Sequence, residues 1–282
     1  MIAQLSPTLA HWLARGEAAI VIRIDDAFGS TPRDAGATMI VSATDAHGTI
    51  GGGQLEFHAI DIARAMIASG EPHRALDIPL GPHLGQCCGG RVALHLQRAD
   101  DAQLAKLSRI EAARDAGAPH ILVFGAGHTG RALARTLALL PARTTLIDDR
   151  GGLFDNLPAA IATRLLDDPT HAIADAPPAA AFIVMTHSHA LDYALTDAAL
   201  RRGDAAYVGM IGSITKRVRF EKWFLQRNGR RDQLARLNCP IGGKTSQDKR
   251  PEIIAAIATA DIAIAAFKTT KHAKENNNER AA

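Results

Sequence analysis

The sequence predicts an α/β protein in which an N-terminal α/β domain precedes a doubly wound parallel-sheet domain. Three observations lead to this prediction. The chain has 282 residues with 47% hydrophobic content, enough to form the cores of two domains. After Pro119, apolar strands, glycine-containing turns and helical patterns alternate, which is typical of a parallel sheet with helices on both faces. The segment "GAGHTG", Gly125–Gly130, matches G-x-G-x-x-G between a strand pattern and a helix pattern, so we expect a Rossmann-like fold there.

The first half of the chain mixes helix and strand patterns. Ser6 is the expected N-cap of a short helix with Pro7 in its first turn, and "AAIVIRI" is an apolar strand pattern. In order, we expect a helix from Ser6 to about Arg15, strands over 18–24 and 38–43, a helix opened by the glycines at 51–53, and a strand over 91–97. The apolar residues Leu55, Ala59, Ile62 and Met66 would lie on one face of the second helix.

The second half repeats a strand–turn–helix pattern. A charged, alanine-rich helix over 100–116 is expected to link the halves, and a last apolar helix runs over 251–267. Between them we expect an apolar strand, a helix closed by Pro141, a strand ending at Asp148 and Asp149, and strand–helix pairs over 180–203 and 205–229. The predicted boundaries are 1–98 for the N-terminal domain, 99–118 for the linker helix, 119–267 for the Rossmann-like domain and 268–282 for a polar, disordered tail.

Composition excludes several classes of protein. No run of 18 apolar residues is present and the N-terminus does not resemble a signal peptide, so we expect no membrane span and a cytoplasmic location. Three cysteines do not make a disulfide framework, and their thiols are then free for chemistry. A net charge of +3 and 4% aromatic content argue against binding of nucleic acid.

The glycine-rich turn at 125–130 predicts a binding site for a phosphate. Gly125 and Gly127 allow a sharp turn and a close approach of a ligand to the backbone. The amides at the start of the following helix offer partial positive charge to a phosphate or nucleotide. His128 and Gly130 belong to the same turn, and Asp148 lies at the spacing expected for an acid that binds a ribose hydroxyl. The alternative is a fold that has kept the turn and binds nothing.

Further polar residues follow the later strands of the predicted parallel sheet. Ligands of such sheets lie beyond the carboxyl ends of the strands. We therefore expect the crevice to be lined by Thr186, His187, His189, Gly209, Gly212 and Ser213. A zinc site built from His187, His189 and Asp192 is an alternative, although the spacing differs from that of binuclear hydrolases.

Two adjacent cysteines, Cys87 and Cys88, lie in a glycine-rich segment, "LGQCCGGRV". In a strand they would point to opposite faces, but a glycine-flanked loop allows both to face one pocket. A thiolate pair suits a transition metal or a sulfur transfer, so we expect at least one reactive thiol. Packed small hydrophobes and a strained vicinal disulfide are the alternatives. Cys239, before Pro240, is expected to be a packed residue.

Taken together, several segments resemble XdhC-type accessory proteins of xanthine dehydrogenase. The matching segments, in order between about Gly29 and Gly242, are "GSTPRDAGATMIV", "GTIGGGQLE", "GQCCGGRV", "VFGAGHTGRALA", "VMTHSHALDYAL", "YVGMIGSITKR" and "CPIG". The double cysteine resembles the xanthine dehydrogenase branch. The CoxI-like branch commonly has a cysteine in the triple-glycine loop, where this chain has Gln54.

This resemblance implies an accessory protein and not an enzyme. Such a protein would bind the molybdenum cofactor in its molybdopterin form, hold it while a cysteine desulfurase supplies the terminal sulfur, and deliver it to the molybdenum-binding subunit of xanthine dehydrogenase. Cys87 or Cys88 would contact the molybdenum or handle the sulfur. The expected cofactor-binding residues are Gln86, Gly89, Gly125, Gly127, His128, Gly130, Asp148, His187, Gly212 and Ser213.

Other functions stay open from the sequence. The same glycine turn and Asp148 would serve an NAD(P)-dependent oxidoreductase, and a nucleotide could bind there together with the cofactor. No Tyr/Lys pair stands out in the crevice strands to support such an enzyme. The N-terminal domain has few strands and an edge that a partner could cover, so we expect a homo-oligomer, namely a dimer.

Overall fold

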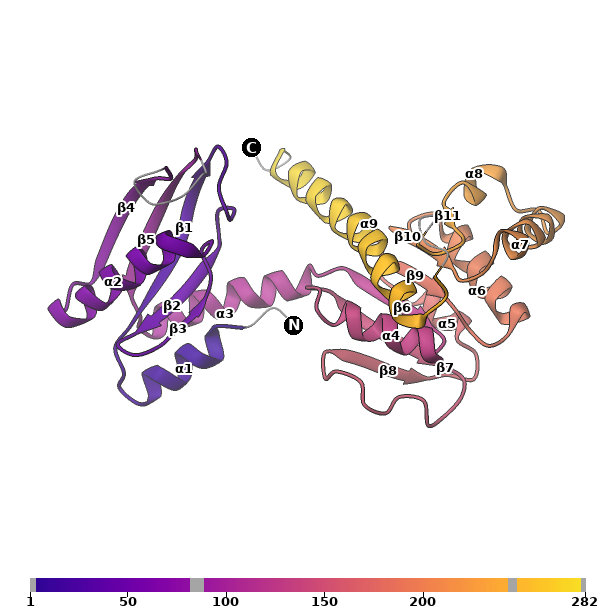
Figure 1. Cartoon of the computed structure of the whole chain (residues 1–282), viewed down its shortest axis with the longest axis horizontal. Coiled ribbons are helices and arrows are strands. Elements are labelled where there is room, and N and C mark those ends of the chain that lie inside the picture. Colours follow the sequence, from indigo (N-terminus) through magenta and orange to yellow (C-terminus); the bar gives the residue numbers. More distant parts are fainter. Residues whose placement is uncertain (1–3, 82–88, 243–247, 280–282) are drawn as a thin grey trace. The chain divides into compact units, whose positions relative to one another are not determined.

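The computed structural model describes residues 4–81, 89–242 and 248–279, with side chains as far as residue 267. The chain forms two units, of which the first ends at Arg114 and the second begins at Asp115 (Figure 1). The predicted fold class is confirmed, since an antiparallel α/β unit precedes a doubly wound parallel sheet. No helix in the described part of the chain has the length and apolarity that a membrane span needs.

The first unit is an antiparallel sheet with helices on both faces. Its elements are α1 (Ser6–Ala14), β1 (Ala19–Phe28), β2 (Thr38–Ser42), β3 (Ala46–Gly48), α2 (Gly53–Ser69), β4 (His73–Pro79), β5 (Arg91–Arg98) and α3 (Asp101–Ala116). The strand order is β3-β2-β1-β5-β4. Alternate residues of β1 separate the two faces: Ile20, Ile22 and Ile24 pack with α2, while Val21 packs with α1 and α3.

Two sequence predictions in this unit need correction. Leu5, and not Ser6, is the N-cap of α1, because Glu111 of α3 accepts from the amide of Leu5 at 2.6 Å and from the amide and hydroxyl of Ser6. Helix α2 buries Ala63, while Ile62 is only partly buried. The core of the unit then extends over β4 as well, a strand that the sequence analysis did not predict.

The second unit is a six-stranded parallel sheet. Its elements are β6 (His120–Phe124), α4 (His128–Leu137), β7 (Arg143–Asp148), β8 (Ile161–Leu165), α5 (Thr170–Ala174), β9 (Ala181–Val184), α6 (His189–Arg202), β10 (Tyr207–Met210), α7 (Ile214–Gln226), α8 (Arg231–Leu234), β11 (Leu237–Asn238) and α9 (Pro251–Glu279). The strand order is β11-β10-β9-β6-β7-β8, and each neighbouring pair is parallel.

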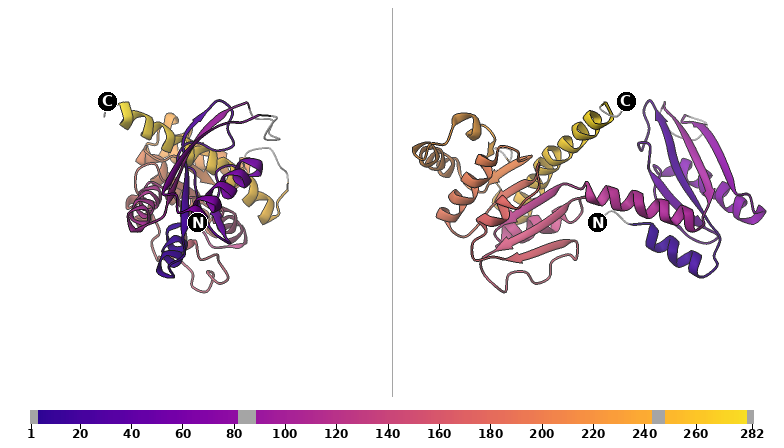
Figure 2. Two further views of the ribbon diagram at one scale, coloured as in Figure 1. Left: turned by 90° about the vertical axis from the view of Figure 1, so that its left-hand side faces the viewer. Right: turned by 180° about the vertical axis from the view of Figure 1, so that it is seen from behind.

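Helices cover both faces of this sheet. One core contains residues of α5, α6, α7 and α8, and the other contains residues of α4 and α9 (Figure 2). The chain runs outward from β6 to β8 in one direction and from β9 to β11 in the other, so the winding reverses between β6 and β9. In open parallel sheets, ligands bind at the carboxyl ends of the strands beside such a switch point.

The last helix is longer than the sequence predicts. We expected this helix to end at Phe267 and a disordered tail to follow, whereas α9 continues to Glu279. Its first turns are held against α4, where the hydroxyls of Thr136 and Thr259 lie 2.6 Å apart. The buried Ala255, Ala258 and Ile262 complete that contact.

Candidate functional site

The candidate site lies where β6, β7 and β9 end. A small pocket at this edge has a volume of about 10 Å³, room for a single water molecule. Its lining residues are Phe124, Gly125, Ile147, Asp148, Asp149, Pro169, Thr186 and Leu191. A larger ligand would therefore lie above this floor, against the loops and helix starts that follow the strands.

Two glycines of the "GAGHTG" turn are required by the protein's own packing. Gly125 has φ +110°, and a Cβ there would lie 2.2 Å from the carbonyl oxygen of Met185 in the loop after β9. A Cβ on Gly130 would lie 1.8 Å from the carbonyl oxygen of Gly125. These two glycines let the turn, α4 and the β9 loop approach closely, whether or not a ligand binds.

Gly127 differs from both of these glycines. It is the N-cap of α4, with φ −66° and ψ −175°, and a Cβ there would meet no heavy atom within 4 Å. Alanine can adopt this backbone conformation, so nothing in the described residues requires a glycine. The space beside Gly127 is open, as a binding position for a phosphate requires.

The first turn of α4 also leaves its amide donors free. Within the described residues, no acceptor is found for the amides of Gly127, His128, Thr129 or Gly130. The helices that follow β9 and β10 are capped instead, since Ser188 accepts from the amide of Leu191 and Ser213 accepts from that of Lys216. The start of α4 therefore has amides available for an anion and, unlike the starts of α6 and α7, no side-chain cap.

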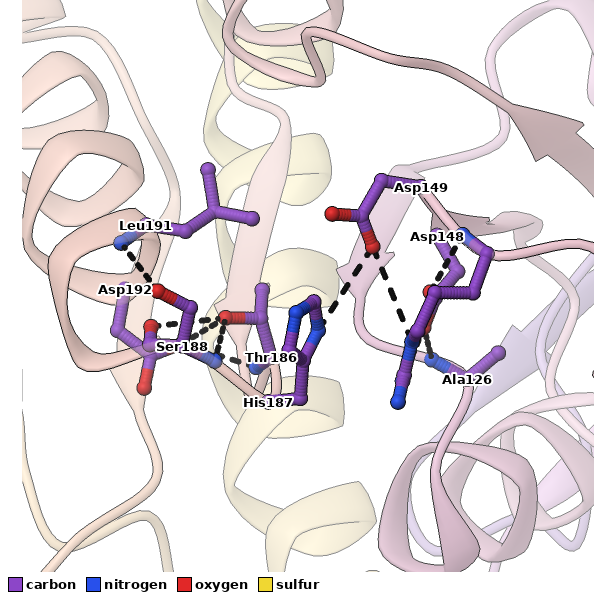
Figure 3. Close-up of polar contacts among 9 residues, drawn as sticks. Ala126, Asp148, Asp149, Thr186, His187, Ser188, Leu191 and Asp192 are labelled. Atoms are coloured by element: carbon purple, nitrogen blue, oxygen red, sulfur yellow. Dashed lines mark hydrogen bonds and ion pairs between the residues drawn. The ribbon is translucent and has the colours of Figure 1, made fainter.

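Asp148 holds the turn in place. Its Oδ2 accepts from the amide of Ala126 at 2.6 Å and from Arg150 Nη2 at 3.0 Å, and its Oδ1 accepts from Arg150 N and Nε (Figure 3). Burial raises the pKa of Asp148, but the hydrogen bonds from Arg150 and Ala126 outweigh it and lower the pKa to about 2. These donors occupy the roughly four acceptor positions of a carboxylate. A ribose hydroxyl would have to displace one of them.

The neighbouring Asp149 faces His187, a predicted site residue. His187 Nδ1 lies 3.7 Å from Asp149 Oδ1, and Arg150 Nε lies 3.8 Å from the same oxygen (Figure 3). One ligand atom from each of Asp148, Asp149 and His187 lies within 4.8 Å of the others. Because Arg150 already binds both carboxylates, it supplies the positive charge that a metal ion would bring. Sequence reasoning missed Asp149, although its position at the end of β7 was the available signal.

The alternative zinc set is not brought together. Asp192 is buried, accepts from the amide and hydroxyl of Thr186 at 2.9 and 2.8 Å, and pairs with Lys216. His187 and His189 are both exposed. In the portion of the chain that is described, no group of potential metal ligands contains His189 or Asp192. Asp192 therefore holds the β9 loop and is not available as a ligand.

Packing within the protein also explains two of the predicted crevice glycines, Gly209 and Gly212. A Cβ on Gly212 would lie 2.5 Å from Cδ of Lys216, so this glycine makes room for the lysine that reaches Asp192. Gly209, predicted to line the crevice, is instead buried within β10, where a Cβ would lie 2.5 Å from the ring of Tyr207. The prediction that Gly209 lines the crevice is wrong, because this residue is buried against the ring of Tyr207 inside the sheet.

The predicted thiol loop is only partly described. Gln86, Cys87 and Cys88 lie outside the described residues, whereas Gly89 is exposed and has no atom near its Cβ position. Cys239 is buried, and burial raises the pKa of its thiol to about 11. Cys239 is therefore a packed residue, as the sequence predicts.

Comparisons with known proteins identify the family of this chain and agree with its fold. The family model of the XdhC Rossmann domain matches residues 121–262, and that of the XdhC and CoxI family matches residues 12–78. Among solved structures, the chain is similar to one described as a xanthine dehydrogenase from Bacillus halodurans, with 17% identity and a TM-score of 0.76 over 95% of this chain and 96% of that one. At that identity the likeness shows the fold alone. No curated protein matches the chain.

Proposed function

The chain belongs to the XdhC and CoxI family, and from this premise we propose that it is an accessory protein in the maturation of xanthine dehydrogenase. It binds the molybdenum cofactor in the molybdopterin form and holds it while a cysteine desulfurase provides the terminal sulfur. It then delivers the cofactor to the molybdenum-binding subunit of the apo-enzyme. As part of this proposal, the protein is cytoplasmic, forms a dimer and does not itself catalyse a reaction.

The observation that carries this proposal is the open start of α4. Molybdopterin ends in a phosphate, and a helix start with free amides and no side chain in the way suits a phosphate. The amides of residues 127–130 have no acceptor within the described residues, and Gly127 leaves space beside them. His128, exposed at the first position of the helix, would donate to a phosphate oxygen of the bound cofactor.

The surrounding residues orient this binding position. Asp148 fixes the turn through the amide of Ala126, and Gly125 lets the turn pack on the β9 loop. Arg150 and His187 lie at the same edge and add donors for an anionic ligand. When bound, the cofactor supplies the molybdenum centre that the client enzyme needs. A cofactor bound by hydrogen bonds and without a covalent link can dissociate, as delivery requires.

The change Gly127→Ala tests the proposal directly. Since the added Cβ lies more than 4 Å from every heavy atom of the described residues around it, it would obstruct a ligand there and not the fold. We expect the purified variant, from cells grown with molybdate, to retain at least about tenfold less pterin and molybdenum than the wild type, measured by fluorescence of the oxidised pterin and by elemental analysis. Gly151→Ala is the matched control, because Gly151 also has no atom near its Cβ position. Equal retention in Gly127→Ala and the wild type would refute the phosphate role.

The thiols of Cys87 and Cys88 need a separate test. We propose that one of them contacts the molybdenum or carries sulfur, because a thiolate is a soft ligand and a nucleophile. Cys87→Ala and Cys88→Ala, made singly, should reduce either cofactor retention or activation of apo-xanthine dehydrogenase in at least one variant. Full retention and full activation in both would dismiss the thiol role while leaving the α4 site intact.

An NAD(P)-dependent oxidoreductase is the second candidate, because the open start of α4 also suits a dinucleotide pyrophosphate. The bonding of Asp148 counts against it, since its acceptor positions are filled by Arg150 and Ala126. Calorimetric titration with NADH and NADPH separates the two functions. Micromolar binding with turnover would replace the cofactor-carrier proposal.

A further inference from the structure

Helix α7 has an apolar line on its outer face as well as on its buried one. Phe220 and Phe224 are fully buried in the core of the second unit. On the other side of the helix, Ile214, Val218 and Leu225 are 54%, 58% and 37% exposed. With 3.6 residues per turn, positions i, i+4 and i+11 fall within about 40° of one another, so these three side chains form one line along the helix.

Cations lie beside this apolar line. Arg219 and Lys222 are exposed on the outer side of α7, and within the described residues neither has a carboxylate partner. The other two cations of the helix are engaged, since Arg217 pairs with Glu221 and Lys216 pairs with Asp192. The outer face of α7 thus combines three apolar side chains with two cations that have no carboxylate partner within the described residues.

The charge of the region extends beyond one helix. Residues 214–236, which cover α7 and α8, contain eight Lys and Arg against two Asp and Glu, a surplus of six. The whole chain has a surplus of only three, so the rest of the chain is acidic on balance. Positive charge is therefore concentrated at α7 and α8, which lie at the same end of the second unit (Figure 1).

We infer that the outer face of α7 is the docking surface for a protein partner that presents apolar side chains beside carboxylates. The inference rests on the proposed function, because it assigns the partner as the apo-enzyme that receives the cofactor. Complementary charge favours such a partner, since it accelerates association and excludes surfaces of the same sign. A nucleic acid would leave the apolar line unused, and a membrane-binding face is typically wider than a single line of three side chains.

The position of α7 explains why a partner would dock there. Ser213 caps the helix directly after Gly212, so the outer face begins at the rim of the candidate crevice. Lys216 reaches from the first turn of α7 to Asp192, which binds the β9 loop at Thr186. A partner on α7 would therefore contact the helix that Lys216 and Asp192 tie to the β9 loop, one wall of the candidate site.

The experiment uses two sets of matched variants of the full chain. Val218→Asp and the double change Arg219→Glu with Lys222→Glu alter the outer face of α7. Leu165→Asp and Arg164→Glu make the same kinds of change on β8, where both residues are exposed. All of these positions face outward, and circular dichroism with thermal melting verifies that each variant is folded. The probe is purified apo-xanthine dehydrogenase, with affinity measured at several salt concentrations and cofactor retention measured in parallel.

We expect both α7 variants to bind apo-xanthine dehydrogenase at least about tenfold more weakly than the wild type, and the charge variant to lose most of the salt dependence. The β8 variants should stay within about twofold, and all variants should retain the cofactor as the wild type does. Wild-type affinity of the α7 variants would overturn the docking surface and leave the proposed function standing. Tighter wild-type binding to vesicles with anionic lipid or to duplex DNA would also overturn it. A wild type that holds no cofactor yet shows the expected docking pattern would refute the proposed function alone.

Discussion

The starts of α2 and α4 are two glycine-rich turns that look alike in sequence and differ in structure. Before α2, in "TIGGGQLE", one oxygen of Glu56 accepts from the hydroxyl of Thr49 and from the amides of Ile50, Gly51 and Gly52 at 2.9, 3.2 and 2.8 Å. Before α4, in "GAGHTG", no acceptor for the amides of the first turn lies within the described residues. The amides that precede α2 thus have an internal anion in Glu56, as the amide of Ala126 before α4 has in Asp148. The amides of the first turn of α4, like those at 53–55 in α2, have no acceptor within the described residues.

The comparison teaches that the position of a nearby carboxylate decides which amides of a glycine turn are left for a ligand. Glu56 is one turn along α2 and reaches back to the amides, as a bound anion would. Burial raises its pKa, but the Thr49 hydroxyl and the three amides outweigh this and lower it, so Glu56 stays ionised. The carboxylate near α4 is Asp148, which binds Ala126 and Arg150 and leaves the first helical turn free.

The largest effect is expected where glycine serves packing alone. Gly130→Ala places a Cβ 1.8 Å from the carbonyl oxygen of Gly125, and backbone atoms cannot rotate away as a side chain would. We expect a loss of at least about 3 kcal/mol in the free energy of unfolding, measured by urea denaturation. If Gly130→Ala were as stable as the wild type, the distinction between packing and ligand glycines in this turn would fail.

A smaller loss is expected from the carboxylate that holds the α4 turn. The pKa of Asp148 falls from 3.8 to about 2 on folding, which corresponds to about 2 kcal/mol of stability. Because the folded pKa is the lower one, this contribution is present above about pH 4 and is lost as the pH falls toward 2. Asp148→Asn should remove a similar amount at pH 7 and flatten the acid side of the stability curve. An unchanged acid limb would contradict the assignment.

The internal anion of the α2 turn should contribute slightly less. Glu56→Ala removes the acceptor of three amides and a hydroxyl, and we expect a loss of about 1.5 kcal/mol, seen as a lower melting temperature. Glu56→Gln keeps a neutral acceptor and should fall between Ala and the wild type. Added inorganic phosphate should stabilise the Glu56→Ala variant, because it can take the place of the lost carboxylate, and should not stabilise the wild-type α2 turn in this way. This result would sharpen the comparison of the two turns.

The smallest effect on stability is expected at Gly127. Its backbone angles suit alanine and its Cβ position is open, so Gly127→Ala should change the free energy of unfolding by less than about 0.5 kcal/mol. Paired with loss of cofactor retention, such neutrality would separate binding from folding. A large destabilisation would show instead that Gly127, like Gly130, is needed for the turn itself.

The strands with apolar runs were predictable from sequence, and the others were not. β6, β9 and β10 are almost wholly buried, so their residues form continuous apolar segments between turns. β8 has one buried residue in five and β4 has one in seven, so neither shows the pattern of a buried strand. Both are edge strands, which backbone pairing with a neighbour holds in the sheet.

For the candidate site, sequence predicted the place better than the roles. His187 and Ser213 follow parallel strands and therefore reach the expected edge of the sheet. Their roles depend on partners far along the chain: Asp192, counted as a possible zinc ligand, is taken by Lys216, and Ser213 caps α7. Asp149 could have been suspected from its position after β7, and its distance to His187 then identifies it as a site residue.

By itself, the sequence determined the doubly wound sheet and the position of the glycine turn. Hydrophobic periodicity and the need for glycine in a sharp turn are local properties, readable within some ten residues. Only the tertiary structure decided that Glu56 binds the amides before α2 and that Asp148 leaves the first-turn amides of α4 without an acceptor in the described residues, because that depends on where a carboxylate comes to lie after folding. The physical reason is that amides without a backbone acceptor attract any anion that can reach them. A carboxylate that the fold holds beside these amides excludes an anion from solution.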